Sequence, residues 1–151
     1  MGDLVILHLG VIDIPYATDG TSTGDVAKWL EDKYSVMGNF AALHADDIQE
    51  FVEIAFAEAI ENVLAGQPAQ LAKPMNQATD DIKALFATYL NNEEIAETGQ
   101  EGVPTAAALA GKRTSFKKMK ELKKPRRRAL TRRPSFVDTG MYRNSFKAWT
   151  D

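Results

Sequence analysis

The sequence predicts an α+β fold in which a long central helix and one or two further helices pack on a small antiparallel sheet. Apolar residues recur with helical spacing over 45–64, and short β-prone segments lie near both ends of the chain. A long basic loop is expected before the C-terminal strand. Because 151 residues suit one core, we expect a single domain over 1–151.

The first part of the chain is predicted to pass from β structure into a helix. Segments 4–9 and 11–16 are β-prone, either as one bent strand or as a hairpin. The helix is expected to start at Ser22 or Thr23, with Asp25 favoured in the first turn by the helix dipole. Its apolar face is formed by Val26, Trp29 and Leu30.

The strongest helical pattern runs from about Ala45 to Leu64, and we expect it to form the spine of the fold. Gly66 followed by Pro68 ends it. Its polar side is predicted to be solvated and carries Glu50, Glu53 and Glu61. Its apolar face is expected to be buried and consists of Ile48, Phe51, Val52, Ala55, Ala59, Ile60 and Val63.

A third helix is predicted to begin at Thr79 as N-cap and to end at Asn91 and Asn92. Asp80 and Asp81 would occupy its positive end. Its apolar face comprises Ile82, Leu85, Phe86, Tyr89 and Leu90.

The charge of the chain is strongly polarised. Residues 1–110 contain four lysines, no arginine and 18 acidic residues, a net charge of −14, whereas residues 111–151 carry +11. Such asymmetry indicates an electrostatic partner: nucleic acid, an acidic protein surface or another copy of the chain. We interpret 111–134 as a mobile basic arm. The side chains expected to form an assembly interface are Lys117, Lys118, Lys120, Lys123, Lys124, Arg126, Arg127, Arg128, Arg132 and Arg133.

The C-terminal segment 135–151 contains an Asp-Thr-Gly triplet at 138–140 among aromatic residues. This triplet is the signature of an aspartic protease, in which two carboxylates share one proton. Only 11 residues follow Gly140, and no second triplet exists, so we interpret it as a structural turn. A short helix near 141–145 and a closing strand should follow. The predicted turn and anchor residues are Phe136, Asp138, Thr139, Gly140, Tyr142, Phe146 and Trp149.

No pattern in the sequence supports catalysis, a cofactor or a metal site, and we predict that the protein is not an enzyme. The absence of cysteine excludes disulfides, thiol catalysis and cysteine-based zinc sites. His8 and His44 lack a third ligand at suitable spacing, so His44 is expected to be a surface histidine near an N-cap. We find no signal peptide and no apolar stretch long enough to span a bilayer, so no membrane partner is expected.

Segment 133–146 resembles the C-terminal signature of tailed-phage tail-completion and head–tail joining proteins. In that family a basic, proline-containing approach leads into an Asp-Thr-Gly turn and then into a closing strand. The matching positions are Pro134, Asp138, Thr139, Gly140, Ser145 and Phe146. Tyr142 stands where an aliphatic residue is commoner, and the acidic N-terminal part and the basic insert also depart from the family. Segment 23–34 is similar to such neck proteins, less specifically.

The resemblance implies a structural virion protein at the head–tail junction, assembled in the host cytoplasm. It would form a homo-oligomeric ring, commonly a hexamer or else a dodecamer, acting as tail terminator, tail-completion protein or neck collar. Its partners would be other copies, neighbouring connector proteins and tail-tube or sheath proteins, with non-specific contact to DNA in the lumen. The alternative is a nucleic-acid-binding module that uses the basic arm 112–133.

Overall fold

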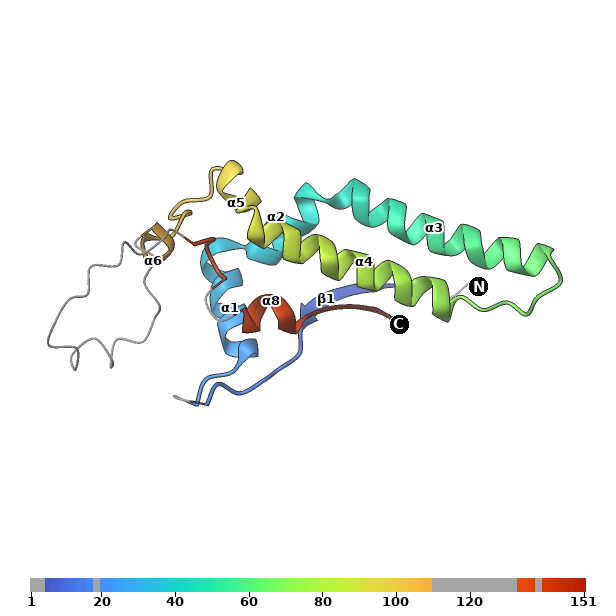
Figure 1. Ribbon diagram of the computed structural model, residues 1–151, viewed down its shortest axis with the longest axis horizontal. Coiled ribbons are helices and arrows are strands. Elements are labelled where there is room, and N and C mark those ends of the chain that lie inside the picture. Colours follow the sequence, from blue (N-terminus) through green and yellow to red (C-terminus); the bar gives the residue numbers. More distant parts are fainter. Residues whose placement is uncertain (1–4, 18–19, 110–132, 138–139) are drawn as a thin grey trace, which may run out of the picture.

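The computed structural model describes residues 5–17, 20–109, 133–137 and 140–151. The chain forms an α+β fold, as predicted, in which helices predominate over a two-stranded antiparallel sheet (Figure 1). The strands are β1 (Leu7–Val11) and β2 (Phe146–Thr150). The helices are α1 (Thr23–Tyr34), α2 (Val36–Leu43), α3 (Ala45–Leu64), α4 (Ala72–Asn91), α5 (Glu94–Glu97), α6 (Ala106–Leu109) and α8 (Met141–Ser145).

Helix α4 lies at the centre of the molecule, with α3 along one side and the two strands along another (Figure 1). It begins at Ala72, so the predicted start at Thr79 was wrong. Pro74 lies in its first turn, where the missing backbone N–H would have no helical partner, so the proline does not interrupt the helix. The predicted end at Asn91 is confirmed.

The main core is an aromatic cluster between α4, α2 and β2. Phe86 stacks on Phe146 with ring centroids 4.0 Å apart, and Phe40 meets Phe86 edge-on at 5.1 Å. Tyr89 is also fully buried, and its hydroxyl donates a hydrogen bond to the carbonyl of Val36 at 3.2 Å. Rings of this size remove a large apolar area from water, so this cluster provides much of the stability of the fold.

Helix α1 begins where the sequence predicts. Ser22 is its N-cap, and Ser22 and Asp25 form a capping box in which each side chain accepts a backbone N–H of the other residue. The predicted apolar face is wrong at Trp29, which is 55% exposed, because the buried face runs through Ala27, Leu30 and Tyr34. The Trp29 ring instead lies beside the ammonium of Lys33, 5.0 Å from its centroid.

Helix α2 was not predicted as a separate helix. Ser35 adopts a left-handed conformation after α1, with φ of 48°, and turns the chain. Both carboxylate oxygens of Glu31 then accept backbone N–H groups of α2, from Met37 at 2.8 Å and from Gly38 at 3.0 Å. A carboxylate at the positive end of a helix is stabilising, so Glu31 fixes the corner between α1 and α2.

Helix α3 has the predicted bounds but is not the spine of the fold. It packs along α4, and among its residues Ala55 alone is fully buried. Together with Met75 and Ala78 of α4, it forms a second, small core cluster. Ile60 and Val63, predicted to be buried, are 59% and 47% exposed, because α4 packs against another part of the helix around Ala55.

Candidate functional site

The described parts of the C-terminal segment, 133–137 and 140–151, are integrated into the body of the molecule. Strand β2 pairs antiparallel with β1, so that Val11 lies opposite Phe146, Leu9 opposite Ala148 and Leu7 opposite Thr150. This register points Phe146 and Ala148 at α4, where both are buried. The closing strand was predicted from the sequence, and its pairing joins the two ends of the described chain.

Ser135 anchors the start of this segment. Its backbone N–H and its hydroxyl both donate to the same carboxylate oxygen of Glu93, at 2.8 Å and 3.0 Å. The hydroxyl oxygen also accepts the N–H of Thr105 at 3.1 Å. Because Ser135 is fully buried, these bonds satisfy groups that water cannot reach. No local pattern predicts this contact, since Glu93 lies 42 residues away.

Phe136, a predicted anchor, lies against the core rather than inside it. It is half-buried, and its ring contacts that of Tyr34 at a centroid distance of 5.1 Å. Its φ of 64° is in the left-handed region, which non-glycine residues adopt only at a cost. Ser135 and Phe136 themselves form a turn of the backbone, and the bonds of Ser135 to Glu93 anchor this turn to the body.

Gly140 occupies the N-cap position of α8 with a φ of 79°, a conformation that suits glycine. Asp138 and Thr139 lie outside the described residues, so the predicted hydrogen bonds of that turn stay a prediction. Tyr142, in α8, is buried as predicted and meets Phe86 edge-on at 6.0 Å. Its hydroxyl oxygen has no hydrogen-bond partner among the described residues.

Trp149, the last predicted anchor, lies on the face of the sheet opposite the core. Its ring stacks on His8 at 5.3 Å and approaches Gly10 to about 3.0 Å from where a β-carbon would stand. The Nε2 of His8 is 2.8 Å from a carboxylate oxygen of Asp151. Trp149 thus packs across the outer face of the two strands and does not enter the core.

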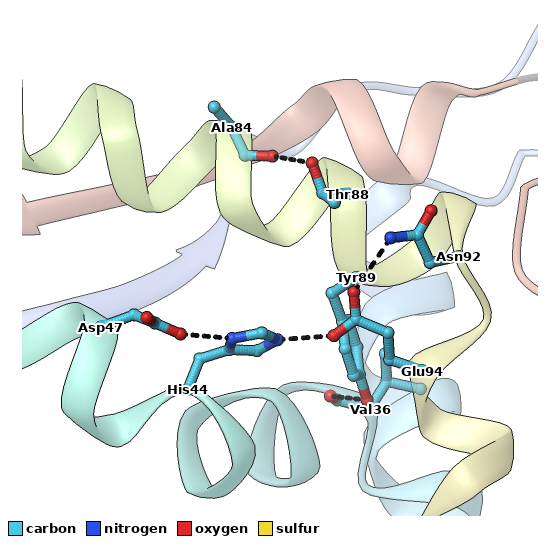
Figure 2. A network of polar contacts seen from close by, with 8 residues as sticks. All are labelled: Val36, His44, Asp47, Ala84, Thr88, Tyr89, Asn92 and Glu94. Carbon is cyan, nitrogen blue, oxygen red and sulfur yellow. Dashed lines mark hydrogen bonds and ion pairs between the residues drawn. The ribbon is translucent and has the colours of Figure 1, made fainter.

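His44, at the junction of α2 and α3, links two distant segments through polar contacts (Figure 2). Its Nδ1 lies 2.8 Å from Asp47 and its Nε2 lies 2.8 Å from Glu94 of α5. The two ring nitrogens of His44 thus each face a carboxylate. The prediction of a surface histidine was wrong, because the His44 side chain is only 12% exposed and packs beside Phe40 and Tyr89.

Arg133 is the one member of the predicted basic interface that the structure describes. Its guanidinium donates to the carbonyl of Val137 at 3.0 Å, and its backbone N–H contacts the carbonyl of Ala108 at 3.3 Å. Arg133 therefore belongs to the packed body. The remaining predicted interface residues, from Lys117 to Arg132, lie outside the described residues.

Several exposed apolar side chains follow the far half of α3. Ile60 is 59% exposed and Leu64 is 82% exposed, and Phe56 and Val63 lie along the same side. The six acidic residues of α3 are all exposed, and the helix has no lysine or arginine. Ile60 and Val63 belong to the predicted apolar face, which was assigned to the core, whereas Phe56 and Leu64 were not part of that face.

The described residues contain no group of three histidine, cysteine, aspartate or glutamate side chains that could hold a metal ion. None of their helices is long and apolar enough to cross a membrane. An open hollow with a volume of about 230 Å³ lies between the end of α3 and the start of α4. Its lining comprises Glu58, Asn62, Gln67, Pro68, Gln70, Lys73 and Pro74, which pair no nucleophile with a base.

Comparison of the chain with protein-family models, with curated proteins and with solved structures found no match. The geometry of the C-terminal segment and the charge distribution are therefore the observations on which a functional proposal can rest.

Proposed function

We propose that this chain is a structural virion protein of a tailed phage, which forms a ring at the head–tail junction and joins the capsid connector to the tail. The observation that carries this proposal is the architectural role of segment 133–151. Ser135 is bound to Glu93, Gly140 starts α8, and Phe146 fills the core, so this segment closes the fold. These positions belong to the segment that resembles the head–tail joining family.

Charge supplies the physical basis for assembly. Residues 1–110 carry −14, whereas 111–151 carry +11, so the basic part of one copy is attracted to the acidic part of the next. Such a contact is heterologous, since two different surfaces meet, and it repeats around a ring until the rotation closes. Arginine and carboxylate pairs provide directional, charge-assisted hydrogen bonds at such an interface.

The proposal is tested by measuring the assembly state of the purified full chain with native mass spectrometry and electron microscopy. We expect closed rings that dissociate as the salt concentration rises. Replacing Lys124, Arg126, Arg127 and Arg128 with glutamine should abolish the rings and leave the far-ultraviolet circular dichroism unchanged. The control replaces the four body lysines, Lys28, Lys33, Lys73 and Lys83, and makes the same change in charge; it should still form rings.

A chain that remains monomeric under all these conditions would contradict the proposal. Monomers that bind duplex DNA without sequence preference and with a steep salt dependence would instead support the nucleic-acid-binding alternative through 112–133. Loss of both ring formation and DNA binding in the arm variant would not distinguish the two functions, so the assembly state is measured without DNA.

A further inference from the structure

The far half of α3 presents an apolar surface that nothing in the described chain covers. Phe56, Ile60, Val63 and Leu64 recur at spacings of three and four residues, so their side chains share one side of the helix. Each of them is more than one third exposed. We refer to these four residues as the α3 stripe. Contiguous exposed apolar surface of this kind marks an interaction site.

Carboxylates flank the α3 stripe. Glu53 lies three residues before Phe56, and Glu61 lies three residues before Leu64, so both are neighbours of the stripe on the helix surface. Both are exposed, and no salt bridge of the described residues involves either one. The surface therefore combines apolar contact area with uncompensated negative charge.

This charge decides what can cover the stripe. A second α3 packed against it would bring Glu53 and Glu61 of one helix close to the carboxylates of another, and like charges at short range repel. A suitable partner carries positive charges interspersed with apolar side chains. Segment 112–132 has this composition, with 11 lysines and arginines, one acidic residue, and Phe116, Met119, Leu122 and Leu130 among them.

The path of the chain favours the segment of another copy. Residues 110–132 connect α6 to Arg133, whose N–H contacts Ala108, so the 23 intervening residues leave and return at one place. Out and back, they reach at most about 40 Å when fully extended. Helix α3 alone is about 30 Å long, and α6 lies at the opposite end of the molecule from the end of α3 (Figure 1). Reaching its own stripe would consume almost all of that length.

We propose that the α3 stripe, with Glu53 and Glu61, is the docking surface for the basic segment 112–132 of a second copy of this chain. The apolar residues of the segment cover Ile60 and Leu64, and its lysines and arginines neutralise the flanking carboxylates. This inference rests on the proposed assembly into a ring, and it assigns the surface on which each copy receives its neighbour.

Cysteine cross-linking of the full chain tests this contact, because the natural sequence contains no cysteine. Two single variants, Ile60→Cys and Met119→Cys, are mixed and treated with a short bis-maleimide, so that a heterodimer reports contact between copies. The control partner is Ile12→Cys, since Ile12 is exposed to a similar degree and lies outside α3. We expect the heterodimer yield with Ile60→Cys to exceed the control on the order of tenfold.

A second variant tests the charge contribution. Glu53→Gln with Glu61→Gln in the Ile60→Cys background should lower the cross-link yield severalfold, whereas Asp80→Asn with Asp81→Asn on α4 should leave it unchanged. Circular dichroism verifies that each variant is folded. An equal loss from both pairs would overturn the assignment of the charge contribution to the α3 stripe.

The outcomes separate this inference from the proposed function. Rings without preferential cross-linking at Ile60 would overturn the docking site and leave the ring proposal intact. Cross-linking within one chain of an Ile60→Cys/Met119→Cys double variant, with none between the mixed single variants, would show that the segment covers its own helix and would also overturn the inference. Absence of both rings and cross-links would overturn both proposals.

Discussion

The two ends of the molecule are packed very differently. At the end formed by α1, α2, α8 and the strands, Phe40, Phe86 and Phe146 form a dry aromatic cluster. At the far end, α3 meets α4 through the small cluster of Ala55, Met75 and Ala78, and large apolar side chains remain in water. The first end thus provides stability, whereas the second provides surface for contact.

The same contrast holds for polar groups. Near the aromatic cluster, Glu31 binds two N–H groups of α2, and Glu93 binds the N–H and the hydroxyl of Ser135. On the far half of α3, no salt bridge of the described residues involves Glu53 or Glu61. Acidic residues are structural at one end and are exposed charges at the other.

The largest effect on stability is expected when a ring of the aromatic cluster is removed. Phe146→Ala removes a fully buried ring that stacks on Phe86, and should lower the free energy of unfolding by about 3–5 kcal/mol. Trp149→Ala, on the opposite face of β2, loses mainly its stacking on His8 and should cost about 1 kcal/mol. Urea unfolding measures both. Equal losses would show that the two faces of the strand are equally important.

Raising the pH should also weaken the aromatic end. Burial raises the pKa of Tyr89 and of Tyr142 above the ordinary value of about 10, with a further contribution from the charge of Glu31. Above about pH 10 the two tyrosines lose their phenolic protons in the unfolded chain but retain them in the folded chain. The stability that is fully present below about pH 10 is therefore lost as the pH rises, by about 1.4 kcal/mol per pH unit for each tyrosine.

Urea unfolding at pH 9 to 11.5 measures this dependence. The Tyr89→Phe/Tyr142→Phe double variant should show a shallower decline over that range, since lysine titration remains as background. A double variant that loses stability as steeply as the natural chain would contradict the assignment to these two hydroxyls.

Substitution of Ser135 measures how much the attachment of segment 133–137 to the aromatic end contributes to the free energy of unfolding. Ser135→Ala leaves the N–H of Thr105 without its acceptor and removes one of the two donors to Glu93, inside the protein. We expect a loss of about 2 kcal/mol in the free energy of unfolding. Ser145→Ala is the matched control, because this buried hydroxyl donates only to the carbonyl of Tyr142 three residues earlier, and should cost less, about 1 kcal/mol.

The two buried tyrosines differ in one hydrogen bond. The hydroxyl of Tyr89 donates to Val36, whereas that of Tyr142 has no partner among the described residues. At neutral pH, Tyr89→Phe should therefore cost about 1 kcal/mol, and Tyr142→Phe should be neutral or stabilising. Thermal unfolding of the two single variants measures the difference. A loss at Tyr142 as large as that at Tyr89 would contradict it.

Local signals in the sequence predicted much of this fold, and contacts between distant residues explain what they missed. The start of α1, the bounds of α3, and the succession of α8 and β2 follow from capping residues, apolar spacing and a glycine turn. The start of α4 was placed too late because Thr79 and the two aspartates after it resemble an N-terminus. In the structure Thr79 donates instead to the carbonyl of Asn76, inside the helix.

The remaining differences concern which surfaces are covered. The periodicity of α3 shows that one side is apolar, but it cannot show that α4 covers only part of that side. Likewise, the pairs His44 with Glu94 and Ser135 with Glu93 join residues 50 and 42 positions apart. Such pairs depend on how the helices pack, and no local pattern predicts them.

The smallest effect is expected on the α3 stripe, where a change should be nearly silent in the monomer. Ile60→Ser replaces a side chain that is 59% exposed, so the free energy of unfolding at low protein concentration should change by less than about 0.5 kcal/mol. Met75→Ala, in the small cluster facing α3, should cost about 2 kcal/mol or more, because Met75 is buried.

Sedimentation velocity over a range of protein concentrations then separates folding from association. If the far end of α3 serves contact, Ile60→Ser should weaken self-association while its unfolding curve remains that of the natural chain. A loss of stability equal to that of Met75→Ala would instead place Ile60 in the core of the monomer. The contrast between a stabilising end and a contacting end would then not hold, because the apolar residues of both ends would stabilise the folded monomer.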